Sequence, residues 1–135
     1  MAERHFTPEE ANELLEEVRP IAESLVSHRR SFTVAAARRA RLSQRISGNG
    51  GDFDPQEPSE VNEQLEREAE AVARAVDELQ QLGVLVKDLD RGLVDFPALR
   101  DGEEVLLCWQ VGEDEVAFWH GPEEGFAGRK PLPLD

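Results

Sequence analysis

The chain has 135 residues, of which 39% are hydrophobic and 33% are charged. This length suits one domain with a hydrophobic core, and the balance of apolar and charged residues is typical of a soluble globular protein rather than a disordered one. The formal net charge of −14 repels phosphate groups, so we expect neither nucleic acid nor an anionic membrane as a partner.

Two further features bear on where the protein works. The sequence starts without an apolar signal segment, and its apolar runs are all shorter than the roughly 18 residues of a membrane-spanning helix. The only cysteine, Cys108, cannot form a disulfide within the chain, which suits a reducing compartment. We therefore expect a cytoplasmic protein.

Residues 7–46 have the pattern of one long amphipathic helix. Thr7 and Glu10 form a capping box at its start. Apolar residues then recur at steps of three and four, which is the seam of a coiled coil. Pro20 lies inside this pattern, and because the seam keeps its phase across Pro20 we expect a kinked but continuous helix.

A second helix is predicted over residues 59–82. The preceding segment, 47–58, is rich in glycine, aspartate and proline and is predicted to be a loop. Ser59 can cap the helix at its start, and Gly83 suits the cap at its end. Residues 1–83 should therefore form a long antiparallel helical hairpin.

Charge is divided unequally between the two predicted helices. Residues 24–51 contain six arginines and no acid, whereas residues 52–78 contain ten acids and two arginines. An antiparallel hairpin places the two segments side by side. The arginines could instead form a patch for anions or nucleic acid, but adjacent opposite charge would quench its field. We favour a hairpin whose charges match internally.

After Gly83 the pattern becomes that of a small antiparallel β-meander. Strands are predicted at 84–86, 93–96, 105–110 and 115–120, with turns at Asp90-Arg91-Gly92, Asp101-Gly102 and Gly112-Glu113. Pro97 should lie at a strand end or an edge, because it cannot donate to a ladder. The chain is thus predicted to be a single α+β domain, 1–135, with the meander and a C-terminal loop in 84–135.

The last predicted hairpin has an expected register. A symmetric loop around Gly112-Glu113 pairs three residues on one face: Trp109 with Val116, Leu107 with Phe118 and Val105 with His120. On the other face it pairs Leu106 with Trp119 and Cys108 with Ala117. Both faces are apolar, so we expect the helices to cover one and the C-terminal loop or another subunit to cover the other. A three-residue loop would shift this register.

Several motifs are similar to those of a known family. They are Gly92-Leu93-Val94-Asp95-Phe96-Pro97, Leu107-Cys108-Trp109, Gly112-Glu113, Trp119-His120 and Gly125-Phe126-Ala127-Gly128-Arg129, together with the opening HFTPEEANELLEEVRP. They resemble a bacterial family catalogued as domain of unknown function 2203, over essentially the whole chain. The resemblance implies no established activity.

His120, Glu113 and Asp95 are the candidate metal ligands, because histidine and carboxylates can hold a divalent ion or act as a general base. The sequence has no His-x-x-x-His and no Cys-x-x-Cys pair, so the spacing of known metal motifs is not met. We favour a structural histidine and expect no cofactor. Cys108, inside a strand, is expected to be a small core residue rather than a nucleophile.

Asp95 and Arg129 complete the set of candidate residues. Asp95 lies in an apolar run, and a buried carboxylate needs a partner, for which we expect His120 or Arg129. Arg129 follows a glycine-spaced loop and can bind a phosphate or a carboxylate such as that of Asp95 or Glu113.

The leading hypothesis is a non-enzymatic interaction or assembly protein that forms a homo-oligomer, most simply a dimer, and that binds a protein partner. It assigns no catalytic residue. A structural or partner-binding surface would then contain Asp95, Trp109, Trp119, His120 and Arg129. The alternative is an enzyme or binding protein for a small anion or metal, with its site between the sheet and the loop 125–129.

Overall fold

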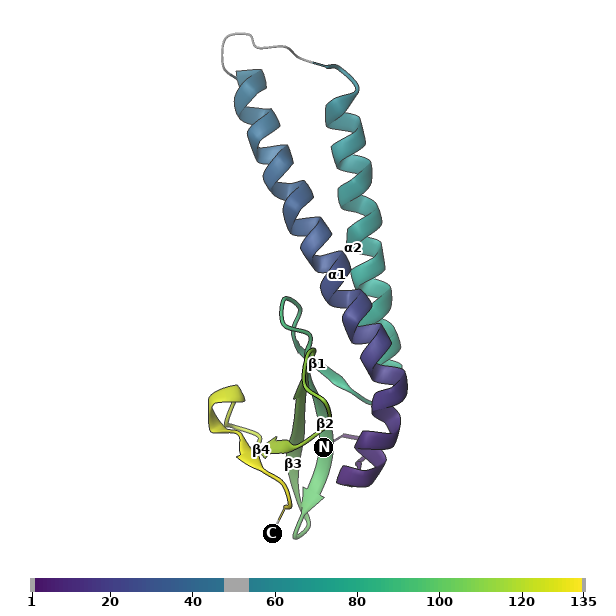
Figure 1. Ribbon diagram of the computed structural model, residues 1–135, viewed down its shortest axis with the longest axis vertical. Helices are drawn as coiled ribbons and strands as arrows, with labels where there is room; N and C mark the ends of the chain where they lie inside the picture. Colours follow the sequence, from purple (N-terminus) through teal and green to yellow (C-terminus); the bar gives the residue numbers. More distant parts are fainter. Residues whose placement is uncertain (1, 48–53, 135) are drawn as a thin grey trace.

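The structure is a computed structural model that describes residues 2–47 and 54–134. It has the α+β architecture that the sequence predicts, with two long helices that rise from one end of an antiparallel sheet (Figure 1). We call α1 and α2 together the helical arm. The elements are α1 (Pro8–Ser47), α2 (Glu57–Gln81), β1 (Leu85–Asp88), β2 (Leu93–Arg100), β3 (Glu103–Gln110), β4 (Phe118–His120), the 3₁₀ turn η1 (Phe126–Gly128) and β5 (Lys130–Pro131).

The start of α1 confirms the predicted capping box. The Thr7 N–H donates to Glu10 Oε1 at 2.9 Å, and the Glu10 N–H donates to Thr7 Oγ1 at 3.1 Å. These two bonds satisfy two of the backbone donors that a helix start leaves free. The helix then continues through Pro20, as expected, and its axis changes direction in the purple N-terminal part (Figure 1).

The start of α2 was predicted too late. The helix begins at Glu57 rather than at a Ser59 cap, because Pro58 suits the first turn, where a missing N–H costs nothing. Of the expected loop 47–58, residues 48–53 lie outside the described residues. At the other end Gly83 has φ +91°, the left-handed conformation expected after a helix C-terminus.

The sheet has five strands in the order β1-β2-β3-β4-β5, one more than predicted. The additional strand, β5, is a short segment that pairs with β4. The Asp101-Gly102 turn between β2 and β3 is confirmed, since both residues have the positive φ that a two-residue hairpin turn requires. Pro97 lies within β2 but beyond the last residue that pairs with β1, which is compatible with its missing N–H.

The predicted register between β3 and β4 is wrong by one residue. The structure pairs Leu106 with His120, Leu107 with Trp119 and Cys108 with Phe118. Residues 111–117 leave the sheet instead of forming a symmetric hairpin, because the Val116 backbone bonds to the Asn12 side chain of α1. Since side chains alternate along a strand, the shift exchanges the faces predicted for Trp119 and His120.

The main core lies between the helices and one face of the sheet. Alternate residues of β2 and β3 form its sheet side, namely Val94, Phe96, Ala98, Val105, Leu107 and Trp109, and Trp119 of β4 joins them. Val18, Ala22 and Leu25 of α1 and Leu79 of α2 pack in the same cluster. Asp95, Cys108 and His120 alternate with these positions and therefore lie on the opposite face.

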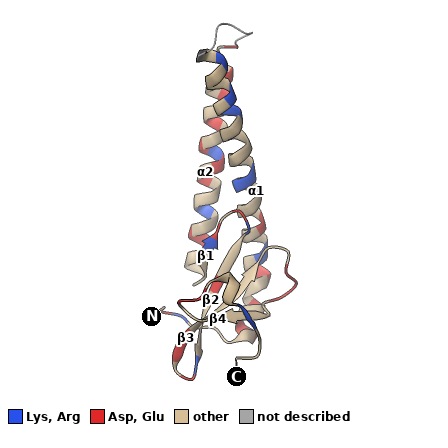
Figure 2. Ribbon diagram, turned by 90° about the vertical axis from the view of Figure 1, so that its left-hand side faces the viewer, with Lys and Arg blue, Asp and Glu red and all other residues tan. Residues whose placement is uncertain are grey.

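The helical arm also has the internal charge matching that we expected. Glu57 Oε1 accepts from Arg38 and Arg45, each at 3.2 Å, and His28 Nδ1 lies 2.7 Å from Glu68 Oε2. Figure 2 shows basic and acidic segments close together along the arm, where the part of α1 from residue 24 onward contributes only basic ones. A small second core lies beneath these pairs and contains Ala35, Leu42, Val61 and Leu65. Among the described residues, no helix is long and apolar enough to span a membrane.

Candidate functional site

Asp95 and His120 form a buried pair on the sheet face opposite the helices. Their exposed fractions are 1% and 4%, and His120 Nε2 lies 3.2 Å from Asp95 Oδ1. Asp95 belongs to β2 and His120 to β4, so β3 separates their backbones and their side chains meet above it. The expectation that Asp95 would find a partner in His120 is confirmed.

The protonation of this pair follows from a second hydrogen bond. His120 Nδ1 lies 2.8 Å from the carbonyl oxygen of Gly121, and a carbonyl can only accept, so Nδ1 carries a proton. In the neutral ring Nε2 is then an acceptor, and an ionised Asp95 carboxylate is also an acceptor. A hydrogen bond between them therefore needs one further proton, carried either by His120 Nε2 or by the Asp95 carboxyl group. Burial raises the pKa of Asp95, while the charges of His120 and Lys87 act in the opposite direction.

Cys108 is the third member of this cluster. It lies directly opposite Asp95 in the pairing of β2 with β3, and its side chain is on the same face of the sheet. Burial, with the adjacent Asp95 charge, raises the pKa of the thiol to about 12, so Cys108 is a thiol rather than a thiolate in this setting. One ligand atom each from Asp95, Cys108 and His120 lies within 4.8 Å of the other two, and we call these residues the Asp–Cys–His cluster.

A cavity of about 170 Å³ opens beside the cluster. Asp95 and His120 line it directly, and Phe126 of η1 closes one side. Lys87 also lines it, with Nζ 4.0 Å from Asp95 Oδ2. The C-terminal segment therefore covers this face of the sheet, as expected, and leaves a small space over two members of the cluster.

Arg129 does not meet Asp95 and instead holds Glu113. Its Nη2 donates to Glu113 Oε1 and Oε2 at 2.7 and 2.8 Å, which was the second of the two predicted partners. The guanidinium carbon lies 4.1 Å from the ring centroid of Phe118 and 4.5 Å from that of Phe126. Cation–π contact on both sides, together with the ion pair, fixes the C-terminal segment against the sheet.

The remaining candidate residues lie outside the cluster. Trp109 is fully buried, and its Nε1 donates to the carbonyl of Glu113 at 3.0 Å. Trp119 lies on the helix side, with the Arg100 and Lys130 cations 5.1 and 4.7 Å from its ring. Both tryptophans therefore pack the core, and Glu113 serves the loop after β3 rather than a group around His120.

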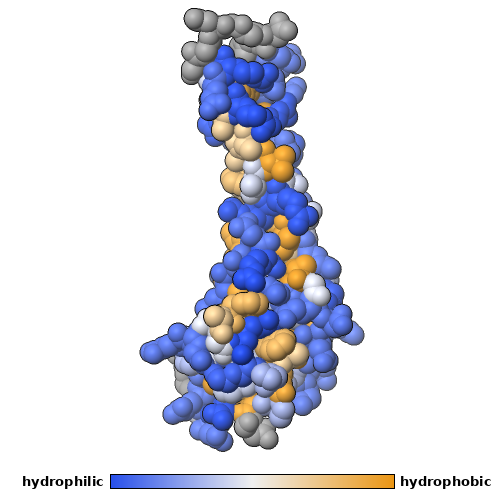
Figure 3. Space-filling view, turned by 60° about the vertical axis from the view of Figure 1, so that its left-hand side comes forward, coloured by the Kyte–Doolittle hydropathy of each residue, from blue (hydrophilic) through white to orange (hydrophobic). Residues whose placement is uncertain are grey.

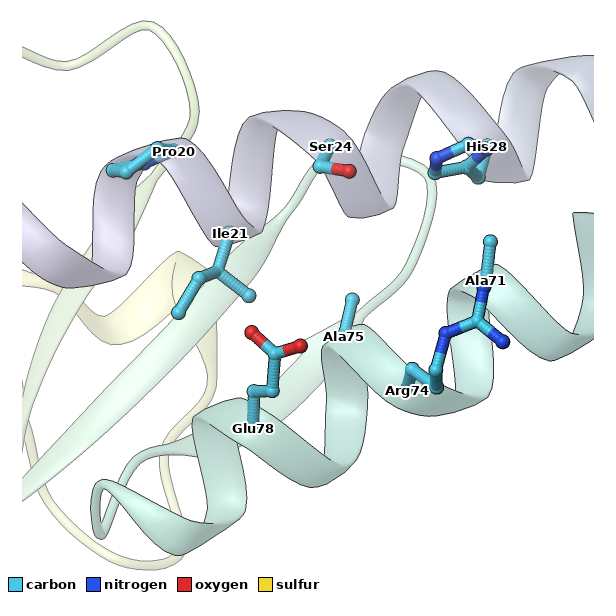
Figure 4. Close-up of a pocket in the computed structure, with 8 residues that line it drawn as sticks. All are labelled: Pro20, Ile21, Ser24, His28, Ala71, Arg74, Ala75 and Glu78. Carbon is cyan, nitrogen blue, oxygen red and sulfur yellow. The ribbon is translucent and has the colours of Figure 1, made fainter.

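A groove of about 300 Å³ separates α1 from α2 near Pro20 (Figure 4). Ile21 of α1 and Glu78 of α2 point toward each other across it, and Ala71 and Ala75 lie on the α2 side. The alanine side chains are too short to fill the space between the helices. The groove therefore follows from small residues at the contact between the helices.

Reasoning from the sequence missed Cys108 as a neighbour of Asp95, although the necessary signal was present. A two-residue turn at Asp101-Gly102 pairs Arg100 with Glu103, and counting back along both strands places Asp95 opposite Cys108. His120 could not be placed in the same way, because the predicted register of β4 was wrong.

Comparison with known proteins gives the family of the chain. Residues 4–132 match the family described as "Uncharacterized conserved protein (DUF2203)", and the chain belongs to this family. No curated protein and no solved structure gives a significant match. The family description assigns no activity, so the function has to be argued from the geometry.

Proposed function

We propose that the protein is a non-enzymatic interaction or assembly module that acts as a homodimer, in which the helical arms of two copies pack against each other. One observation carries the proposal. The helical arm extends well past the sheet (Figure 1), and beside its small buried core it carries further apolar side chains that the chain itself covers only partly.

The incompletely covered residues follow the helical period. Ala69, Val72, Ala73 and Val76 recur along one side of α2, and the two alanines are exposed while the two valines are half-buried. On α1, Phe32 and Ala36 are half-buried and the Val34 side chain is 61% exposed. Figure 3 shows apolar groups in orange and tan between polar ones along the arm.

A second copy is the occupant that this shape favours. Two helical hairpins pack into a four-helix bundle, which buries the side of each helix that its own hairpin leaves open. A two-fold dimer uses the same surface on both copies, so the apolar side of α2 would meet its own counterpart. Alanines at 69 and 73 allow the close approach that such a contact needs.

Sedimentation equilibrium of the full chain tests this proposal. We expect a concentration-dependent dimer, and we expect the double variant Ala69→Glu/Ala73→Glu to weaken it by at least about tenfold in Kd, because two carboxylates per copy would be placed in an apolar contact. Both alanines are exposed, so the fold of the single copy should tolerate the change.

The control is Ala127→Glu, which adds one carboxylate, against two in the double variant, at an exposed alanine of η1, away from the arm. It should leave the dimer unchanged. A wild-type chain that stays monomeric at all concentrations would reject the proposal. A dimer that responds equally to both variants would place the interface elsewhere.

We also propose a cytoplasmic location. The support is the single cysteine, Cys108, which is buried as a free thiol and so depends on no oxidising compartment. Fractionation of cells that produce the full chain with a small C-terminal tag would test it, and recovery in a membrane or exported fraction would reject it.

A further inference from the structure

Three side chains with metal-binding atoms converge on the sheet face turned away from the helices. They come from neighbouring strands, Asp95 from β2, Cys108 from β3 and His120 from β4. Each is buried, and the ladder of hydrogen bonds between the strands holds their backbones in place. The arrangement therefore rests on paired strands rather than on a loop.

The ring of His120 is oriented as in metal-binding histidines. Its Nδ1–H donates to the Gly121 carbonyl at 2.8 Å, which fixes the tautomer and leaves the Nε2 lone pair directed at Asp95. A histidine that binds a metal generally donates its second ring N–H to a carbonyl or carboxylate in this way.

The distances within the Asp–Cys–His cluster also suit a tetrahedral ion. Zinc bonds to nitrogen and oxygen of about 2.1 Å separate the two ligand atoms by roughly 3.4 Å at a tetrahedral angle. The separation of His120 Nε2 from Asp95 Oδ1 is 3.2 Å. A zinc–sulfur bond of about 2.3 Å places sulfur roughly 3.6 Å from the same nitrogen. All three atoms already lie within 4.8 Å of one another, so small side-chain rotations suffice.

We propose that Asp95, Cys108 and His120 are the three protein ligands of a divalent transition-metal ion, with zinc as the best fit. A carboxylate oxygen, a thiolate sulfur and an imidazole nitrogen are all ligands that zinc accepts, whereas calcium and magnesium select oxygen alone. On binding, the proton of the Cys108 thiol and the proton shared by Asp95 and His120 both pass to solvent. Without an ion, a hydrogen bond links Asp95 and His120, and Cys108 lies beside them.

The fourth coordination position would face the cavity. Asp95 and His120 line that cavity and Cys108 does not, so an entering ion meets the first two residues with the sulfur behind them. The carboxylate and the thiolate neutralise a divalent ion, and Lys87 adds a positive charge 4.0 Å from Asp95. Three protein ligands with one open position define a site that exchanges water or a small anion.

Titration of the full chain with Co²⁺ tests the proposal directly. Bound cobalt should give a thiolate-to-cobalt charge-transfer band in the near ultraviolet, at one ion per chain, and added Zn²⁺ should remove it. Because Cys108 is the only cysteine, the band has a single assignment. Cys108→Ser should abolish the band, and His120→Gln and Asp95→Asn should each weaken cobalt binding by at least about tenfold.

The matched control is His28→Gln, which removes a histidine that also pairs with a carboxylate but lies on the arm. It should leave the titration unchanged. Circular dichroism of each variant establishes that it is folded. The absence of a band in the folded wild-type chain would overturn the proposal, and so would a band that persists at full strength in both His120→Gln and Asp95→Asn.

A measurement on the wild-type protein tests the metal site without any substitution. X-ray absorption at the zinc edge of the loaded chain should give one sulfur at about 2.3 Å with nitrogen and oxygen for the other ligands. A coordination shell without sulfur would overturn the assignment. The outcome is independent of the dimer, because the ligands all come from one copy.

Discussion

At the scale of single residues, the molecule buries three side chains that carry reactive groups, those of Asp95, Cys108 and His120. Asp95 is buried and hydrogen-bonded to His120, with Cys108 beside it on the next strand. A buried carboxyl group without such partners would cost several kilocalories per mole of stability. The side chains therefore depend on one another, and the Asp95 charge helps to raise the pKa of the Cys108 thiol.

The buried thiol gives a prediction about reactivity. With the pKa of Cys108 raised to about 12 by burial and by the Asp95 charge, the native chain should react with iodoacetamide at pH 8 roughly a thousandfold more slowly than the unfolded chain. Mass spectrometry of samples quenched over time, with and without urea, measures both rates. Comparable rates would show that the thiolate is accessible in the native fold.

At the scale of secondary-structure elements, the loop between β3 and β4 connects the sheet to α1. Asn12 of α1 donates to the Val116 carbonyl at 3.1 Å and accepts from the Val116 N–H at 2.7 Å. Arg19, about two helical turns further along α1, donates to the carbonyls of Glu113 and Asp114. These bonds take the place of the hairpin ladder that the sequence pattern predicted.

Replacement of Asn12 should therefore lower the free energy of unfolding by more than is usual for a residue near the surface. Asn12→Ala leaves the Val116 N–H and carbonyl without partners, and we expect the free energy of unfolding to fall by about 1–3 kcal/mol. Urea unfolding followed by circular dichroism measures the change. The matched control, Asn62→Ala, makes the same substitution at an exposed position of α2 and should have little effect. An equal loss in both variants would mean that the bonds to Val116 contribute nothing.

The elements also show what local sequence can and cannot predict. The capping box at Thr7 and the turn at Asp101-Gly102 depend on neighbouring residues, and both were predicted correctly. The register of β4 depends on a bond between residues 12 and 116, far apart in sequence, and was predicted wrongly. The second helix begins earlier than predicted because two nearby signals, Pro58 and Ser59, compete for its start.

In the candidate site, too, some features could be predicted from the sequence and others could not. The sequence predicted the pairing of Asp95 with His120 from the need of a buried carboxylate for a partner. It left two partners open for Arg129, Asp95 and Glu113, and the structure has Arg129 bound to Glu113. The cluster as a whole has no sequence spacing that could reveal it, since its three members come from three strands.

At the scale of the whole molecule, the net charge of −14 acts on any association between copies. Two acidic chains repel each other over a distance of about one Debye length, which falls from roughly 10 Å at 0.1 M salt to 3 Å at 1 M. The contact we propose is apolar, so salt weakens the repulsion without weakening the attraction.

Added salt should therefore strengthen the proposed dimer. We expect its Kd, measured by sedimentation equilibrium, to decrease as sodium chloride increases from about 0.05 to 0.5 M, because screening removes the repulsion between like charges. An uncharged osmolyte at equal osmolality serves as the control. A Kd that increases with salt would indicate a contact held by ion pairs instead of apolar side chains.

The unbroken first helix has a mechanical consequence. Beyond Val26, which packs against the main core, α1 extends for roughly 30 Å without a joint. A stiff rod of that length turns a rotation of about 5° at its base into a displacement of roughly 3 Å at its tip. The base is bonded to the loop that Arg129 holds from the far side of the sheet. A shift of the C-terminal segment would thus be amplified along the arm like the motion of a lever.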